Sequence, residues 1–105
     1  MSKRLELFDK LIAGGSRDPF HHYARAMELR ALKRSDDALA AFVALTTQFP
    51  DYVPSYLMAA QVAQEAGDPA RARIFATAGI ASANRAGDEH AKSELEALRD
   101  ALPPG

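Results

Sequence analysis

The 105-residue chain contains no cysteine, which excludes disulfide bonds, thiol catalysis and zinc sites built on thiolates. A long apolar run is missing as well. The stretch from Leu5 to Ile12 is interrupted by Glu6, Asp9 and Lys10, so it cannot be the core of a secretory signal, and no window is apolar enough to span a membrane. We therefore expect a cytoplasmic protein with no membrane segment.

A dominant charge of one sign is also absent, because the formal net charge is −1. The charges are nevertheless unevenly placed. Residues 1–34 carry eight Lys or Arg against four Asp or Glu, whereas residues 35–105 carry five against ten. This predicts a polarised surface, with the basic part interpreted as a solvated helix face or, alternatively, a contact for an acidic partner. It gives no basis for nucleic-acid binding.

Period-two alternation of apolar residues does not occur, so no strand is predicted. Apolar residues recur instead at helical spacing between turn residues, which predicts an all-α chain of about six helices. These helices are expected at residues 3–13, 19–32, 35–49, 54–66, 69–86 and 88–102.

Helix starts carry residues suited to capping. Asp18 precedes Pro19 and Asp68 precedes Pro69, an order in which the carboxylate accepts from free backbone N–H groups and proline fills the first helical position. Ser35 is expected to cap the third helix with its hydroxyl. Two aspartates follow it and face the positive end of the helix dipole.

Ala38 and Ala72 occupy matching places in two alanine-rich helical stretches, 34 residues apart, a period typical of helical-hairpin repeats. The residues of matching size are His22, Tyr23, Ala26, Leu29, Ala38, Phe42 and Pro50 in the first hairpin, and Tyr56, Ala60, Gly67, Ala72 and Gly79 in the second, where Phe75 lies one residue before the aromatic position. In this pattern the stretch from Pro19 to about Ala86 resembles two tetratricopeptide repeats. An up-and-down bundle or another helical solenoid would not require this period.

The resemblance implies a right-handed superhelical stack of antiparallel helical hairpins in a single domain, 1–105. It divides the chain into an N-terminal helix and turn (1–17), repeat one (19–52), repeat two (53–86) and a capping helix (88–102), with Glu94 among the charged residues of that helix that face water. Arg25 and Lys33 depart from the family pattern, which usually has Leu and Gly there. Arg25 is expected to find an internal acceptor or to extend to the edge.

In that family the first helix of each repeat lines a concave face along which ligands lie. The resemblance assigns this groove to Phe20, Tyr23, Met27, Arg30, Leu57, Gln61 and Gln64, and their spacing places each set on one helical face. We expect Tyr23, Met27 and Leu57 to anchor an apolar group. Arg30 would hold a carboxylate, and the glutamines would bond to a peptide backbone. The alternative is that Phe20 and Tyr23 pack on the first helix as core.

Other chemistries have weaker support. Some members of the family clamp a terminal carboxylate with Lys and Asn, but Tyr23 and Met27 stand at the matching positions. His21 and His22 point about 100° apart on a helix, so they are interpreted as a solvated pair rather than metal ligands. Ser35 is interpreted as a cap because no histidine is expected beside it to act as a base. No metal, cofactor or catalytic residue is predicted.

The chain is therefore interpreted as a non-enzymatic protein–protein interaction module, binding a peptide or helix of an unidentified partner in its concave groove. The alternative is a structural or assembly scaffold. Such a protein would self-associate into a homo-oligomer through the groove or through an incompletely covered end of the stack.

Overall fold

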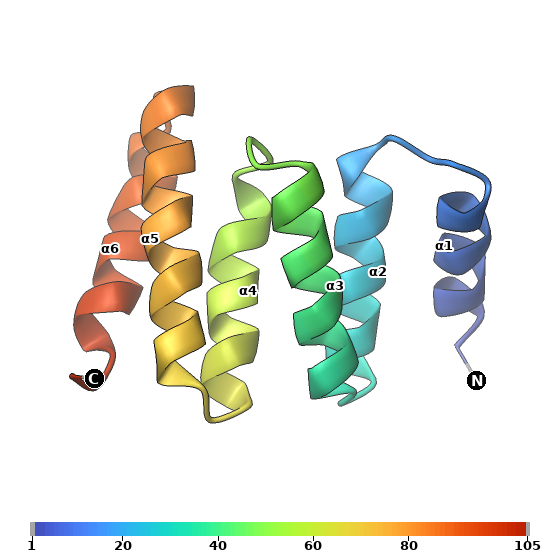
Figure 1. Cartoon of the computed structure of the whole chain (residues 1–105), viewed down its shortest axis with the longest axis horizontal. Helices are drawn as coiled ribbons and strands as arrows, with labels where there is room; N and C mark the ends of the chain where they lie inside the picture. Colours follow the sequence, from blue (N-terminus) through green and yellow to red (C-terminus); the bar gives the residue numbers. More distant parts are fainter. Residues whose placement is uncertain (1, 105) are drawn as a thin grey trace.

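The computed structural model describes residues 2–104. This part of the chain forms six helices and no strand: α1 (Lys3–Ala13), α2 (Pro19–Ala31), α3 (Ser35–Gln48), α4 (Pro54–Glu65), α5 (Pro69–Ala86) and α6 (Glu89–Ala101). Consecutive helices run in opposite directions, and the two termini lie at opposite ends of the stack (Figure 1). The structure confirms the predicted all-α stack of hairpins, with each helix end within one residue of its expected place.

Four helices are capped by the side chain that precedes them. Ser2 caps α1, and the carboxylates of Asp18, Asp68 and Asp88 cap α2, α5 and α6. Each side chain accepts a hydrogen bond from a backbone N–H group at 2.9 to 3.1 Å. These bonds satisfy donors that the first turn of a helix leaves unpaired.

The turn between α2 and α3 shows that the predicted hydroxyl cap at Ser35 is wrong. Lys33 is left-handed, with φ +62°, and Gly67 takes the same conformation at the matching turn, with φ +75°. After this reversal the helix begins early: Arg34 is the N-cap residue, Ser35 is already helical, and no side chain caps α3. Arg34 donates instead to Asp37 at 2.8 Å.

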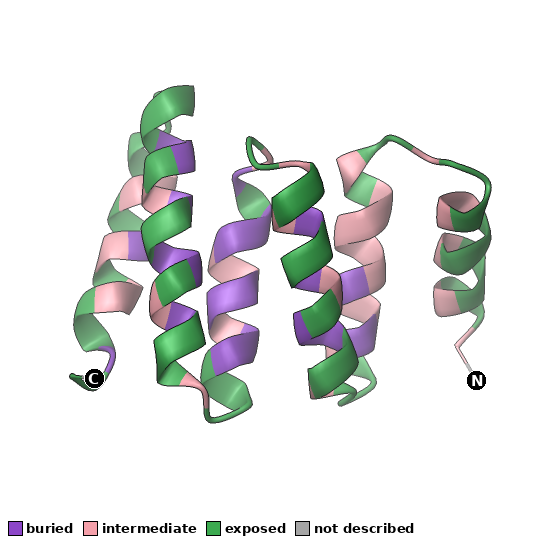
Figure 2. Ribbon diagram, in the orientation of Figure 1, coloured by how far each residue is buried: buried purple, intermediate pink, exposed green. Residues whose placement is uncertain are grey.

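Small side chains let the helices approach one another. Ala38 and Ala72, the pair that carries the repeat, are both fully buried, as is Phe42. Figure 2 shows most of the buried residues on the middle helices. Helix α1 contributes none of the fully buried positions, although its partly buried Leu5 packs on the core. The core therefore belongs to the two hairpins between the end helices.

The stack curves toward one side. Within residues 2–104, α4 contacts α2 and α6 in addition to its chain neighbours, whereas α3 contacts neither α1 nor α5. The layer made of α2, α4 and α6 is thus the tighter one, and α1, α3 and α5 spread apart. This geometry makes the α2, α4 and α6 layer the concave face, which is called the groove below.

Helix α5 approaches α4 and α6 closely at Gly79, where there is no room for a side chain. A Cβ atom at this position would lie 2.5 Å from Tyr56 Cβ and 2.9 Å from Leu95 Cδ1. Because Tyr56 Cβ is attached directly to the α4 backbone, rotation of the tyrosine side chain cannot relieve that contact. The glycine therefore sets the spacing of the last three helices.

Polar contacts join the two hairpins to each other and α1 to the first hairpin. The carbonyl oxygen of Pro50 accepts hydrogen bonds from Tyr56 Oη at 2.6 Å and from Ser82 Oγ at 2.9 Å, which joins the end of repeat one to α4 and α5. At the other end, Arg25 Nε donates to Asp9 Oδ1 at 2.6 Å. This confirms that Arg25, in a position usually held by leucine, finds an acceptor within the chain.

Candidate functional site

The predicted groove residues of α2 differ in their burial. Phe20 is 53% exposed, so it is not part of the core. Tyr23 is half-buried, and its ring packs against Phe42 and Tyr52 with centroid separations of 6.5 and 5.7 Å. Met27 is also half-buried and rests on the core. The α2 side of the groove thus offers an apolar surface whose side chains Tyr23 and Met27 are held in place by contacts with the core.

Arg30 is already engaged within the chain. Its Nη2 and Nε atoms contact the two carboxylate oxygens of Glu65 at 2.5 and 3.2 Å, and Nη1 donates to Gln61 Oε1 at 3.1 Å. The pKa of Glu65 is lowered, first by the hydrogen bond from Arg30 and further by its charge. A ligand carboxylate would have to displace Glu65 to reach this guanidinium.

A cavity of about 390 Å³ lies between α2, α4 and α6. Its apolar walls include Tyr23 from α2, Leu57 and Met58 from α4, and Ala91 and Leu95 from α6. Tyr23, Leu57 and Ala91 follow one another at 34-residue steps, so the same position of α2, α4 and α6 faces one space. The volume is in the range of about 300 to 1,000 Å³ in which proteins hold small ligands.

The α6 side of this cavity was missed by the sequence reasoning. Asp88, His90 and Glu94 line it; Glu94 is exposed, as the sequence predicted, but its place at this cavity was not predicted. One more 34-residue step, from Leu57 to Ala91, would have shown that α6 stands where the first helix of a third repeat would lie. Of the remaining predicted residues, Gln61 is held by Arg30 and Gln64 is exposed outside the cavity.

Tyr23, which lines the cavity, and Tyr52, which packs against Tyr23, keep their hydroxyl protons. Burial raises the pKa of Tyr23, with the neighbouring Tyr52 adding to the effect and the positive charge of Arg30 opposing it. Burial also raises the pKa of Tyr52, and the carboxylate of Asp18 raises it further. Both hydroxyls are therefore neutral at physiological pH and able to donate or accept a hydrogen bond.

The structure resembles two structures of a tetratricopeptide repeat domain protein from Salinibacter ruber. Its solution NMR structure is 30% identical to this chain, with a TM-score of 0.74, over 79% of this chain and 84% of that one. Its crystal structure is 30% identical, with a TM-score of 0.72, over 78% and 92%. The chain belongs to the tetratricopeptide repeat family.

A third likeness concerns the fold alone. The solution structure of a Bordetella parapertussis protein gives a TM-score of 0.77 over 95% of this chain and 87% of that one, at 23% identity. No protein-family model and no curated protein matches the sequence. Tetratricopeptide repeat domains are in general protein-interaction modules, and this chain has their fold.

The adjacent histidines of this tetratricopeptide repeat domain, His21 and His22, are partly buried against Ser16, rather than fully solvated as the sequence interpretation had it. His21 Nδ1 lies 2.7 Å from Ser16 Oγ, and His22 Nε2 lies 3.1 Å from the Ser16 carbonyl oxygen. The His22 ring also packs on Phe49, with centroids 5.2 Å apart. Both side chains fix the loop that leads into α2. Residues 2–104 contain no group of three or more potential ligands placed to hold a metal ion.

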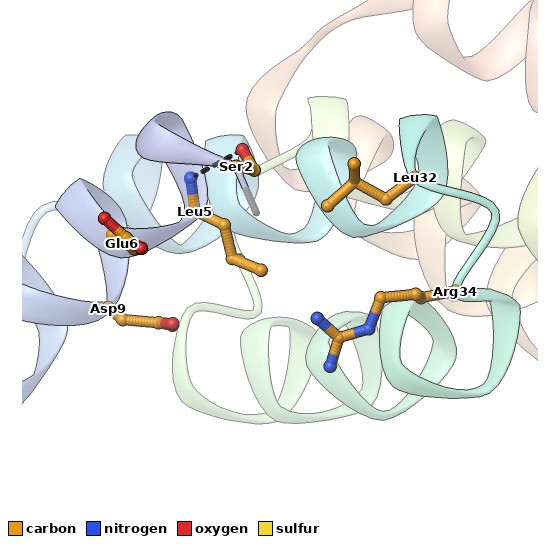
Figure 3. Close-up of a pocket in the computed structure, with 6 residues that line it drawn as sticks. All are labelled: Ser2, Leu5, Glu6, Asp9, Leu32 and Arg34. Atoms are coloured by element: carbon orange, nitrogen blue, oxygen red, sulfur yellow. Dashed lines mark hydrogen bonds between the residues drawn. The ribbon is translucent and has the colours of Figure 1, made fainter.

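Another cavity, of about 520 Å³, lies between α1 and the turn that joins α2 to α3 (Figure 3). Leu5 and Leu32 form its apolar part, while Asp9 and Arg34 face it from opposite sides. The charged groups have partners in the chain, because Asp9 binds Arg25 and Arg34 binds a neighbouring aspartate.

In residues 2–104 no helix has both the length and the apolar character needed to cross a bilayer.

Proposed function

We propose that this domain binds a peptide or helix of a partner protein in the groove formed by α2, α4 and α6. The observation that carries the proposal is the cavity lined by Tyr23, Leu57 and Ala91, one from each helix of the concave layer. A repeated position that opens onto a shared space suits a chain-like ligand, because successive ligand residues can meet successive repeats. A binding role is proposed rather than a catalytic one.

We assign the groove residues different kinds of contact with the ligand according to their chemistry. Tyr23, Met27 and Leu57 supply apolar contact, and Phe20 extends it at the start of α2. Gln61 and Gln64 supply amide groups for the ligand backbone. Arg30 could bind a ligand carboxylate only if that carboxylate displaced Glu65, so we propose that it chiefly holds α2 against α4. We expect about micromolar affinity or weaker, as small interfaces often give.

Self-association through the ends of the stack has less support. Helix α1 exposes Lys3, Arg4, Glu6 and Lys10 and one large apolar side chain, Leu7, which is 54% exposed, and α6 exposes Glu89, Ser93 and Asp100. A single exposed leucine among charged and polar side chains is not a large apolar surface, so the end helices complete the stack instead of offering such a surface to a second copy.

Peptide display followed by NMR tests the proposal. Random peptides displayed on phage would be selected on the immobilised domain, and the enriched sequences would be titrated into ¹⁵N-labelled protein. We expect the amide shifts to concentrate on α2, α4 and α6 around the cavity. Shifts concentrated on the convex helices α3 and α5 would refute the groove.

A matched pair of variants sharpens the result. Leu57→Glu puts a carboxylate into the cavity wall, whereas Ile74→Glu makes a similar change on the convex side, where Ile74 is 67% exposed. The selected peptides should lose at least tenfold in affinity for Leu57→Glu and keep their affinity for Ile74→Glu. Circular dichroism confirms that both variants fold. Equal affinity for the two variants would contradict the proposal.

A further inference from the structure

The two ends of the groove differ in charge. At one end Arg30 is paired with Glu65, so neither offers a free full charge to a ligand. At the other end the cavity is lined by Asp88, Glu94 and His90, and none of the described residues that line it is a lysine or arginine. The cavity is therefore an apolar space bordered on its α6 side by carboxylates.

These carboxylates differ from many others in the protein in having no arginine partner. Arginine pairs with Asp9, Asp37, Asp51, Glu65 and Asp68 at distances of 2.5 to 3.7 Å. Within residues 2–104, Asp88 forms no ion pair and uses one oxygen to cap α6, while the partner of Glu94 is His90 at 3.1 Å. The described part of the chain therefore supplies no lysine or arginine to neutralise the acidic side of the cavity.

We propose that the ligand is a peptide with an apolar residue in the cavity and a lysine or arginine next to it, held by Asp88 and Glu94. This inference rests on the proposed function, since it names the chemistry of the peptide bound at that site. The apolar residue meets Tyr23, Leu57 and Leu95, and the adjoining cation meets the carboxylates a short distance along the chain. Charge complementarity then sets which peptides bind, in addition to how fast they do.

Three synthetic nonapeptides test the charge preference. Each is acetylated and amidated, has a central leucine in a glycine–serine background, and carries arginine, glutamine or glutamate on both sides of the leucine. Titration into ¹⁵N-labelled domain at neutral pH and low salt gives both the site and the affinity. We expect all shifts around the cavity, with the arginine peptide about 2- to 30-fold tighter than the glutamine peptide, as two exposed ion pairs provide, and the glutamate peptide weaker still.

Two double variants locate the source of the preference. Asp88→Asn with Glu94→Gln removes both carboxylates while asparagine can still cap α6, so the arginine and glutamine peptides should bind about equally. Glu89→Gln with Glu96→Gln removes the same net charge from α6 outside the cavity and should leave the preference intact. An unchanged preference in the first double variant would overturn the inference.

The peptide comparison separates this inference from the proposed function. Equal binding of the three peptides, or tightest binding of the glutamate peptide, overturns the charge preference and leaves groove binding in place. The inference is also overturned if none of the three occupies the cavity while display-selected peptides do. Failure of the display-selected peptides to occupy the groove refutes the proposed function by its own test.

Discussion

The close contact at Gly79 makes a quantitative prediction about stability. In Gly79→Ala the new Cβ would lie 2.5 Å from Tyr56 Cβ and 2.9 Å from Leu95 Cδ1, so α5 must move away from α4 and α6. Overpacking a tight core costs about 1 to 3 kcal/mol, and two such contacts place this site at the upper end. The better helix propensity of alanine returns about 1 kcal/mol. We expect a net loss of about 2 kcal/mol in the free energy of unfolding.

Urea and thermal unfolding followed by circular dichroism measure this loss. For a domain of about this size, 2 kcal/mol corresponds to a melting temperature lower by roughly 8 to 16 °C. The matched control is Thr77→Ala, which introduces the same residue at an exposed position of α5 and should be neutral or slightly stabilising. A Gly79→Ala variant as stable as the wild type, or more so, would refute the close approach of α4, α5 and α6.

The remaining predictions concern single contacts, each measured by urea unfolding. Lys33→Gly should raise the free energy of unfolding by about 0.5 to 1 kcal/mol. It relieves a left-handed conformation that costs a residue with a side chain about 1 to 2 kcal/mol, and part of this gain is offset because glycine loses more chain entropy on folding. A lower free energy of unfolding would contradict this. Ser82→Ala should cost about 1 kcal/mol by removing a buried donor to the Pro50 carbonyl; no change would show the bond to be dispensable. Glu65→Gln should destabilise slightly at neutral pH, since the exposed pair with Arg30 is screened. Because that pairing depresses the folded-state pKa of Glu65, its stabilisation is present above the unfolded pKa and is lost as pH falls through the folded one, so the variant and wild type should converge in acid; a pH-independent difference would argue against the pair.

Local sequence signals were sufficient to place the helices. Asp18, Asp68 and Asp88 cap helices where the sequence predicted starts, because each carboxylate reaches backbone N–H groups a few residues ahead whatever the rest of the chain does. Ser35 shows the limit of this reasoning. The left-handed turn at Lys33 fixes where α3 begins, and the cap residue follows from the turn geometry rather than from its own side chain.

The groove was harder to predict because its contacts join helices that are far apart in sequence. The helical face of Arg30 could be read from spacing, but the pair with Glu65 depends on how α2 and α4 rotate against each other. The spacing of Tyr23 and Leu57 was visible, whereas the third member, Ala91, lies in a helix whose other features indicated a cap. Long-range packing, rather than local preference, decides these positions.

Helix α6 combines two tasks that a longer array would divide between helices. Its buried Leu95 covers the last hairpin at Gly79, which is what a capping helix does, and its Ala91, Asp88 and Glu94 line the groove. The same rigid helix carries both sets of residues, so its position against α5 fixes the width of the cavity. On the proposed function, a displacement of α6 caused by overpacking at Gly79 should therefore change peptide affinity as well as stability. The concave layer therefore consists of three helices, and the proposed binding site includes side chains of the last of them.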